Sequence, residues 1–274
     1  MPDLPEMFDL TGRSAVVTGG AGLLGKQFCQ TLADAGAWVC VVDIDAEAAK
    51  AVARSINRRS GRAIALATDI TQPQSVAAML ERTLEAFGRL DILVNSAALD
   101  PKFDTESIAD QGQNAFETFP LEGWQQALDV NLTGMFLCSQ AAVRPMLQQG
   151  KGVIVNLCSI YGLVGPDQRL YQQEGQAPKV KPVTYSVSKA GVLGMTQYLA
   201  TYYGTKNIRV NALTPGGVFN HHDAAFVDSY STRAVLGRMA EPDEMNGALL
   251  FLSSDASSYM TGANLVVDGG WTAW

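Results

Sequence analysis

The sequence of 274 residues predicts a single α/β domain that is doubly wound around a seven-stranded parallel sheet. Short apolar segments alternate with segments of helical length along the whole chain, which is typical of βαβ units and of strands buried on both faces. A glycine-rich turn follows the first apolar segment directly. No linker or internal repeat interrupts the alternation. We therefore expect residues 1–274 to form one domain.

The first third of the chain is expected to contain four strands and three helices. The first helix begins at the turn Gly19–Gly25 and continues to about Ala35. The expected strands are Ser14–Thr18, Trp38–Val42, Ala63–Ala67 and Asp91–Asn95, and the other two helices are Ala46–Arg59 and Pro73–Phe87.

The rest of the chain continues the pattern after a longer interval. A long helix is expected over Leu121–Gln149, and Pro145 should end or bend it because proline lacks the backbone N–H that a helix needs. The remaining strands are Gly152–Leu157, Ile208–Leu213 and Asn264–Val267, and the remaining helices are Val183–Tyr203 and Pro242–Leu252.

Two polar segments break the rhythm, Leu99–Phe119 and Gly162–Pro182. Each is longer than an ordinary connection between a strand and a helix. Each also follows the carboxyl end of a strand, where open α/β sheets bind their ligands. We expect both inserts to contribute to binding. The alternative is two surface excursions with no role.

The glycine turn predicts a dinucleotide site of the Rossmann type. Glycines at 19, 22 and 25 let backbone N–H groups approach a pyrophosphate at the positive end of the following helix. Asp43 closes the next strand, where its carboxylate can accept hydrogen bonds from both ribose hydroxyls and repel a 2′-phosphate. The sequence thus predicts NAD rather than NADP. The alternative is a turn that serves packing only.

Tyr185 and Lys189 lie four residues apart in a segment without helix breakers, so they share one helix face. An ammonium beside a phenol favours the phenolate, and a shifted phenol can carry a proton near neutral pH. The alternative is a half-buried tyrosine and a solvated lysine. The glycine turn upstream makes the chemical interpretation the preferred one.

Together these motifs resemble the short-chain dehydrogenases/reductases, and the similarity runs from Leu10 to Gly270. The glycine spacing is that of the family's extended branch. The chain length and the carboxyl-terminal Asp-Gly-Gly favour the compact branch. Further stretches that match are Asn95-Ser-Ala-Ala98, Val130-Asn-Leu132, the strand that ends at Ser159, Pro215-Gly-Gly-Val218 and Asp268-Gly-Gly270.

The resemblance implies an oxidoreductase that transfers a hydride between NAD(H) and a secondary alcohol or ketone. Tyr185 would take the proton from the substrate hydroxyl as a phenolate. Lys189 would keep that phenol acidic and bond the nicotinamide ribose. Ser159 would orient the substrate oxygen, and Asn131 would hold a water that links Lys189 to solvent.

The resemblance also implies contacts to NAD at the strand ends, with Asp69 beside the adenine. The expected cofactor-binding residues are Gly19, Gly22, Leu24, Gly25, Asp43, Asp69, Ile70, Asn95, Ala97, Tyr185, Lys189, Pro215 and Val218.

The polar inserts favour a carbohydrate-like substrate. The insert Gly162–Pro182 joins the strand of Ser159 to the helix of Tyr185, so we expect it to act as a substrate lid. A non-catalytic, NAD(H)-binding regulatory protein of the same fold is the alternative. The presence of Ser159, Tyr185 and Lys189 argues against that alternative.

Other polar and aromatic residues are given less specific expectations. His221 and His222 are expected in a solvated loop, with a substrate contact as the alternative, and they lack further ligands for a metal. The charges of the inserts are expected to be solvated, with contacts to a polyhydroxylated or anionic substrate as the alternative. They are Lys102, Arg169, Lys179 and Lys181. Trp271 and Trp274 suit either a satellite of the core or a subunit contact.

Composition limits the partners. A net charge of −7 argues against nucleic acid as a main partner, and no apolar run is long enough to cross a membrane. The four cysteines are scattered, which indicates reduced thiols in a cytoplasmic protein. The remaining partners would be a small-molecule substrate and, as the resemblance implies, further copies of the chain in a homotetramer.

Overall fold

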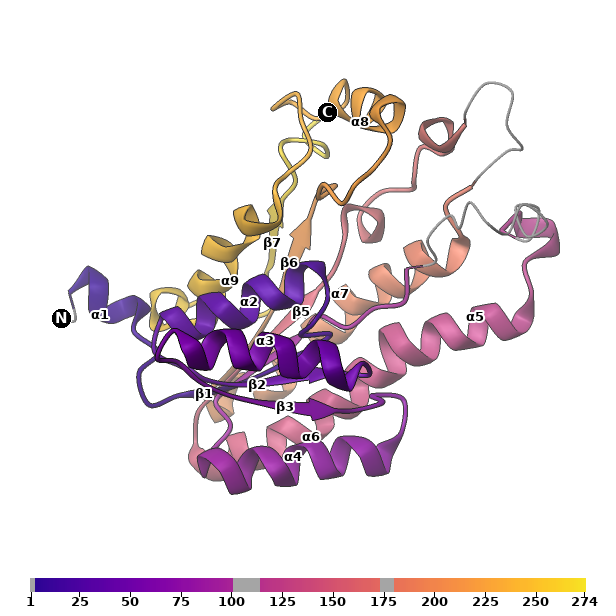
Figure 1. The fold of residues 1–274 in the computed structure, drawn as a ribbon. Coiled ribbons are helices and arrows are strands. Elements are labelled where there is room, and N and C mark those ends of the chain that lie inside the picture. Colours follow the sequence, from indigo (N-terminus) through magenta and orange to yellow (C-terminus); the bar gives the residue numbers. More distant parts are fainter. Residues whose placement is uncertain (1–2, 101–113, 173–179) are drawn as a thin grey trace.

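The structure, a computed structural model, describes residues 3–100, 114–172 and 180–274. Within these ranges seven parallel strands form one sheet in the order β3-β2-β1-β4-β5-β6-β7, with helices on both faces (Figure 1). All seven lie where the sequence predicted them, so the doubly wound fold is confirmed. The strands are β1 (Ser14–Thr18), β2 (Trp38–Asp43), β3 (Arg62–Ala67), β4 (Ile92–Asn95), β5 (Gly152–Leu157), β6 (Ile208–Pro215) and β7 (Asn264–Val267).

The strand order reverses between β1 and β4. The chain moves outward from β1 to β3 and then returns to the other side of β1 as β4. Thr18 at the end of β1 pairs with Val42 on one side and Asn95 on the other, so these strand ends lie level. Ligands of open α/β sheets bind in the crevice at such a reversal point.

Helices cover both faces of the sheet (Figure 1). One layer contains α2 (Leu23–Asp34), α3 (Ala46–Arg58) and α9 (Asn246–Ser253). The opposite layer contains α4 (Pro73–Phe87), α6 (Gly134–Gln149) and α7 (Val183–Tyr203).

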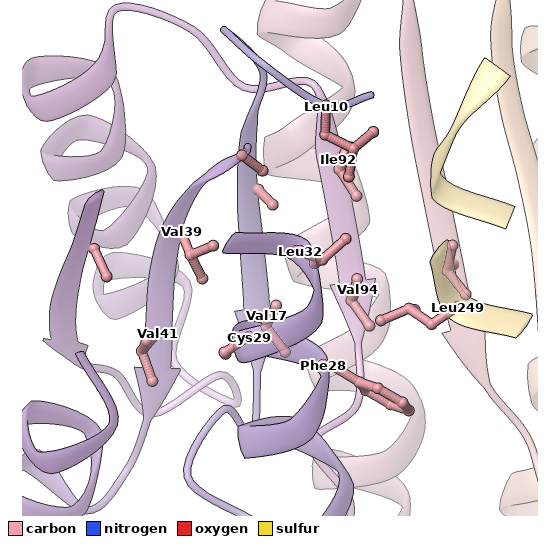
Figure 2. Close-up of a cluster of buried hydrophobic side chains, with 14 of the residues drawn as sticks. Leu10, Val17, Phe28, Cys29, Leu32, Val39, Val41, Ile92, Val94 and Leu249 are labelled. Atoms are coloured by element: carbon pink, nitrogen blue, oxygen red, sulfur yellow. The ribbon is translucent and has the colours of Figure 1, made fainter. Parts of the chain in front are cut away.

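The strands pack against both layers because their side chains are apolar on both faces. In Figure 2, Phe28 and Leu32 of α2 lie over Val17 of β1 and Val94 of β4, and all four are fully buried. Burial of one such side chain stabilises the fold by about 1.5–3 kcal/mol. These contacts hold the strand ends, and hence the site, in fixed positions.

The predicted long helix forms with one local change. A single π-helical turn, Asp129–Thr133, separates α5 (Leu121–Leu128) from α6. Pro145 lies inside α6, which continues to Gln149, so the proline does not end the helix. Isolated π turns in helices often mark functional positions, and this one carries Asn131.

Three helical segments differ from the sequence expectation. The short helices α1 (Leu4–Phe8) and α8 (Ala224–Ser231) were not predicted, because so few residues show no clear periodicity. Asp3 and Asp223 cap them by accepting backbone N–H groups. The helix expected over Pro242–Leu252 forms as a 3-10 turn, Pro242–Met245, that leads into α9.

The inserts are described in part. Residues 101–113 of the first and 173–179 of the second lie outside the described residues, and the latter are part of the predicted lid, which stays a prediction. All four cysteines are free and buried. In the described ranges no helix has the length and apolar character to span a membrane.

Candidate active site

A cavity of about 1140 Å³ opens at the carboxyl ends of the strands. It runs from the glycine turn after β1, past the ends of β2 and β3, to the end of β5 and the start of α7. Its lining includes Ser159 and nearly every residue that the sequence predicted for the cofactor. These are Gly19, Gly22, Leu24, Gly25, Asp43, Asp69, Ile70, Ala97, Tyr185, Lys189, Pro215 and Val218.

The glycine turn is too tight for larger residues. Gly19 has a φ of +63°, and a Cβ there would lie 2.7 Å from the Cα of Ala97. A Cβ on Gly25 would lie 1.9 Å from the carbonyl oxygen of Gly19. Gly22 begins α2 without a side-chain cap, and the first turn of α2 has no acidic residue. The N-terminal N–H groups of α2 can therefore serve an anion such as a pyrophosphate.

Asp43 fixes the turn from the end of β2. One carboxylate oxygen accepts the N–H of Ala21 at 3.0 Å, and the other accepts the N–H of Asp45 at 3.1 Å. Each oxygen keeps a further lone pair for a ligand hydroxyl. Thr18, which the sequence analysis did not single out, holds the opposite wall. Its Oγ1 accepts the N–H groups of Ser96 and Ala97 at 3.1 and 3.2 Å.

The other predicted cofactor residues occupy two kinds of position. The Oδ1 of Asp69 accepts the N–H of Thr71 at 2.9 Å, and this turn lines the cavity. Asn95 is buried, and its Nδ2 donates to Ser139 and Asn156 at 3.1 and 2.9 Å. Its side chain joins β4 to α6 and β5, while Ser96 and Ala97 line the cavity. A direct contact of Asn95 with a cofactor stays a prediction.

Ser159, Tyr185 and Lys189 come together at the far end of the cavity. Tyr185 and Lys189 lie one turn apart near the start of α7, and the Lys189 Nζ is 5.8 Å from the Tyr185 ring centroid. The Nζ donates to the carbonyl of Leu157 at 2.9 Å. Ser159 follows β5, and its Oγ accepts the N–H of Tyr161 at 3.3 Å; like Tyr185 and Lys189, it lines the cavity. A phenol, a hydroxyl and an ammonium thus meet in one place.

Burial controls the proton affinities of this group. It raises the pKa of Tyr185 above its ordinary value, Asp100 adds to the rise, and the neighbouring Ser159 side chain opposes it. Burial also lowers the pKa of Lys189 to about 8. The sequence analysis expected Lys189 to make the phenol acidic. In the protein alone desolvation outweighs that effect, because both charged forms lose water.

Asn131 anchors the start of the first insert. Its Oδ1 accepts the N–H of Leu99 at 2.7 Å, and its Nδ2 donates to the Leu99 carbonyl and to Ser188 at 3.1 and 3.0 Å. The residue is buried on the π-helical turn and links that turn to α7. Both amide hydrogens are therefore used within the protein, and the predicted water at Asn131 stays a prediction.

Aromatic side chains line the cavity beyond Ser159. The hydroxyl of Tyr171 donates to that of Tyr161 at 2.9 Å, and Phe226 packs on Tyr171 with 5.7 Å between ring centroids. Tyr230 stacks on Trp271 at 4.3 Å, so Trp271 belongs to the core, while Trp274 is exposed. The sequence analysis missed this wall because its residues come from separate segments without a shared motif.

Two residues expected in solvent line the cavity, and of these Lys181 is mostly buried whereas His222 is also exposed, as expected. Only 11% of the Lys181 side chain is exposed, and its Nζ lies 4.1 Å from the Tyr185 ring centroid. His222 lines the cavity and stacks on Phe226 at 5.0 Å, and burial lowers its pKa. Arg169 is exposed and pairs with Asp167, as a solvated residue would. Lys102 and Lys179 lie outside the described residues.

Comparisons with known proteins agree with this geometry. A family model described as enoyl-(acyl carrier protein) reductase matches residues 20–272. The chain is 36% identical to cis-4-hydroxycyclohexanecarboxylate dehydrogenase of Sinomonas cyclohexanicum, over 95% of this chain and 97% of that protein. It is 35% identical to D-threitol dehydrogenase of Mycolicibacterium smegmatis, over 97% and 95%.

A solved structure shares the whole fold. It is a gluconate 5-dehydrogenase from Burkholderia cenocepacia J2315 in complex with NADP and tartrate. It has a TM-score of 0.85 at 28% identity, and the match covers 99% of this chain and 100% of that one. The similar proteins are thus dehydrogenases of hydroxylated compounds.

Proposed function

The chain belongs to the short-chain dehydrogenase/reductase family and is an NAD(P)-dependent oxidoreductase, and we propose on this premise that it interconverts a secondary alcohol and a ketone with NAD(H). The observation that carries the proposal is that the side chains of Ser159 and Tyr185 lie with the buried Lys189 at one end of the cavity. These groups border a cavity that also contains the glycine turn.

The residues at the first strand ends fit a dinucleotide. The close approach at Gly19 and Gly25 leaves room for a pyrophosphate at the start of α2, where the free N–H groups stabilise negative charge. Asp43 would accept the ribose hydroxyls, and its charge would repel a 2′-phosphate. The related gluconate 5-dehydrogenase was solved with NADP. The proposed preference for NAD therefore rests on Asp43 alone.

The protein's own groups can carry the proton. When bound, the oxidised nicotinamide supplies the hydride acceptor. Ser159 donates a hydrogen bond to the substrate oxygen and stabilises charge that develops there. In reduction the Tyr185 Oη gives its proton to the substrate oxygen. In oxidation the phenol first loses its proton to solvent, and the phenolate Oη then takes the hydroxyl proton. The Lys189 ammonium stabilises the phenolate while it lacks that proton. Because burial raises the pKa of Tyr185, the resting phenol is protonated and ready to act as an acid in reduction.

The cavity walls favour a ring-shaped or polyhydroxylated alcohol. Tyr161, Tyr171 and Phe226 offer flat apolar faces to ring C–H groups. Phenol and imidazole groups beside them can bond hydroxyls. Two relatives are named for a hydroxycyclohexane acid and for a four-carbon polyol. The carbohydrate-like substrate expected from the inserts is one member of this wider class.

A hydride-transfer assay tests the function. Purified protein is mixed with NAD and a panel of cyclic alcohols, polyols and hydroxy acids, and the absorbance of the reduced nicotinamide is followed. We expect turnover of at least one secondary alcohol. Tight binding of NAD(H) without turnover of any alcohol, or of any ketone in reverse, would favour the regulatory alternative.

We also propose that the protein is a homotetramer. Apolar side chains are exposed along neighbouring helices, Phe136 on α6 and Val187, Tyr198 and Tyr202 on α7. Val266 of β7 is 38% exposed at the other end of the sheet. Two separate apolar surfaces are what a tetramer with two-fold axes requires.

A further inference from the structure

An ion pair joins the ends of the two inserts at the mouth of the site. Asp100 lies just after β4, and Lys181 lies just before α7. The Lys181 Nζ and the Asp100 Oδ1 are 2.6 Å apart. Gln168 holds the backbone of Lys181 by accepting its N–H at 2.8 Å and donating to its carbonyl at 3.2 Å. The backbone that carries the Lys181 side chain is therefore held in place.

The ammonium of Lys181 lies in the cavity beside the reacting group. Its centre is 4.1 Å from the Tyr185 ring centroid, within the range of a cation–π contact. The Lys181 side chain is 11% exposed and that of Asp100 is 46% exposed. Lysine has three N–H donors. Among the described residues Asp100 is the one hydrogen-bond acceptor of this ammonium. A nearly buried cation is thus paired with a partner that reaches into solvent.

The geometry points to Lys181 as the binding group for a carboxylate on the substrate, with Asp100 as the anion that the substrate displaces. This inference rests on the proposed function and narrows it to secondary alcohols that carry a carboxylate. The distance from Lys181 to the Tyr185 ring places that carboxylate a few bonds from the reacting carbinol carbon.

A neutral polyol fits this position less well. A buried ammonium must keep an anionic partner, because an unpaired buried charge is strongly unfavourable. A hydroxyl group cannot replace Asp100 in that role, whereas a carboxylate can. Asp100 can turn toward water when it leaves, since nearly half of its side chain is already exposed.

His222 adds a second, neutral donor to the same cavity. Its Nδ1 accepts the N–H of Asn220 at 3.2 Å, so a neutral imidazole carries its proton on Nε2 and can donate from there. Burial, and to a lesser degree the charge of Lys181, lower the pKa of His222, whereas Asp223 and Asp100 act to raise it. The lowered pKa favours the neutral imidazole, so the cation that pairs with Asp100 is Lys181.

The test compares hydroxy acids with their carboxamides, which have the same shape without the charge. The probes are 3-hydroxybutyrate, 4-hydroxypentanoate and cis-4-hydroxycyclohexanecarboxylate, each beside its carboxamide, with cyclohexanol as a neutral alcohol. The variants are Lys181→Met and Asp100→Asn. Lys151→Met is the matched control, because Lys151 also pairs with an aspartate, Asp255, but lies outside the cavity lining.

We expect wild type to favour at least one acid over its carboxamide by tenfold or more in kcat/KM. Lys181→Met should remove that preference, so that the acid and its carboxamide have similar kcat/KM. Asp100→Asn should increase kcat/KM for the acid, because no anion then competes for Lys181. The two variants thus act in opposite directions. If both variants lose activity on acids and carboxamides alike, the ion pair only holds the two inserts together, and the inference is overturned.

Binding separates this inference from the proposed reaction. The same pairs are titrated calorimetrically into Tyr185→Phe, which keeps the ring beneath Lys181 but lacks the hydroxyl. Tighter binding of an acid than of its carboxamide supports the role of Lys181 even if no alcohol is oxidised. Oxidation of cyclohexanol with no acid preferred in rate or binding overturns the inference and leaves the oxidoreductase proposal standing. No preference for any acid in either measurement likewise overturns it.

Discussion

The Nζ of Lys189 lies 5.8 Å from the ring centroid of Tyr185, one turn away along α7. A hydrogen bond to the carbonyl of Leu157 holds it there. At this separation the two groups influence each other, yet burial has the larger effect on both. It raises the pKa of Tyr185 and lowers that of Lys189, which favours the neutral form of each. At rest Tyr185 is therefore a neutral phenol, and the phenolate forms only when a substrate reacts.

Tyr185→Phe should lower kcat by at least the contribution of a general acid–base group, about 100- to 10,000-fold. The ring remains, so packing and NAD affinity should change little. Stopped-flow kinetics and NAD titration measure the two effects. Normal turnover in a correctly folded variant would show that another group carries the proton.

Lys189→Met should abolish turnover and weaken NAD binding, yet stabilise the protein without cofactor. Folding lowers the Lys189 pKa from about 10.4 to about 8, so below pH 8 the folded state must hold an unfavourable buried charge. This free-energy cost decreases as the pH rises from 8 toward 10.4, because Lys189 loses its proton in the folded state before it does so in the unfolded state. We expect a Tm a few degrees above wild type at pH 7 and a smaller gain at pH 9.5. A gain that grows with pH would contradict the sign of this shift.

Asp43→Asn should narrow the preference for NAD over NADP. The change removes a charge that repels the 2′-phosphate, and it weakens hydrogen bonds that are worth about 1.5–3 kcal/mol when one partner is charged. The ratio of kcat/KM for NAD to that for NADP measures the result. A wild-type enzyme that works better with NADP would show that Asp43 does not control the choice.

Gly19→Ala should destabilise the turn and weaken NAD binding. Alanine at this position would need a φ of +63°, and its Cβ would lie 2.7 Å from the Cα of Ala97. Gly12→Ala is the matched control, because Gly12 has a φ of +76° but no atom within 4 Å of its would-be Cβ. The free energy of unfolding of the control should fall only by the roughly 1–2 kcal/mol that a left-handed backbone costs an alanine. Thermal unfolding with and without NAD distinguishes them, and equal behaviour would rule out the close approach.

The double change Tyr198→Ser and Tyr202→Ser should weaken subunit association. The two rings stack at 5.8 Å on the exposed side of α7. Tyr259→Ser is the control, because Tyr259 is likewise an exposed tyrosine but lies outside α7. Light scattering gives the mass of each species. A wild-type particle of 29.3 kDa would exclude the tetramer.

Much of the fold could be read from the sequence because its signals are local. Parallel strands buried on both faces contain apolar runs, and β1 and β5 have the bounds that were predicted from those runs. The glycine turn and the four-residue spacing of Tyr185 and Lys189 are likewise set by neighbours in the chain. The short helix α8 and the π-helical turn at Asn131 were missed because too few residues define them.

The character of the site was decided by the tertiary structure. Lys181 and a solvated lysine look alike in sequence, and only the packing of α7 against the ends of both inserts places this ammonium over Tyr185 and beside Asp100. The pKa of Tyr185 followed the same rule, since its rise comes from water excluded by distant segments. The amino-acid sequence thus determined which chemical groups the site contains. Desolvation, which sums over neighbours remote in sequence, determined how those groups behave.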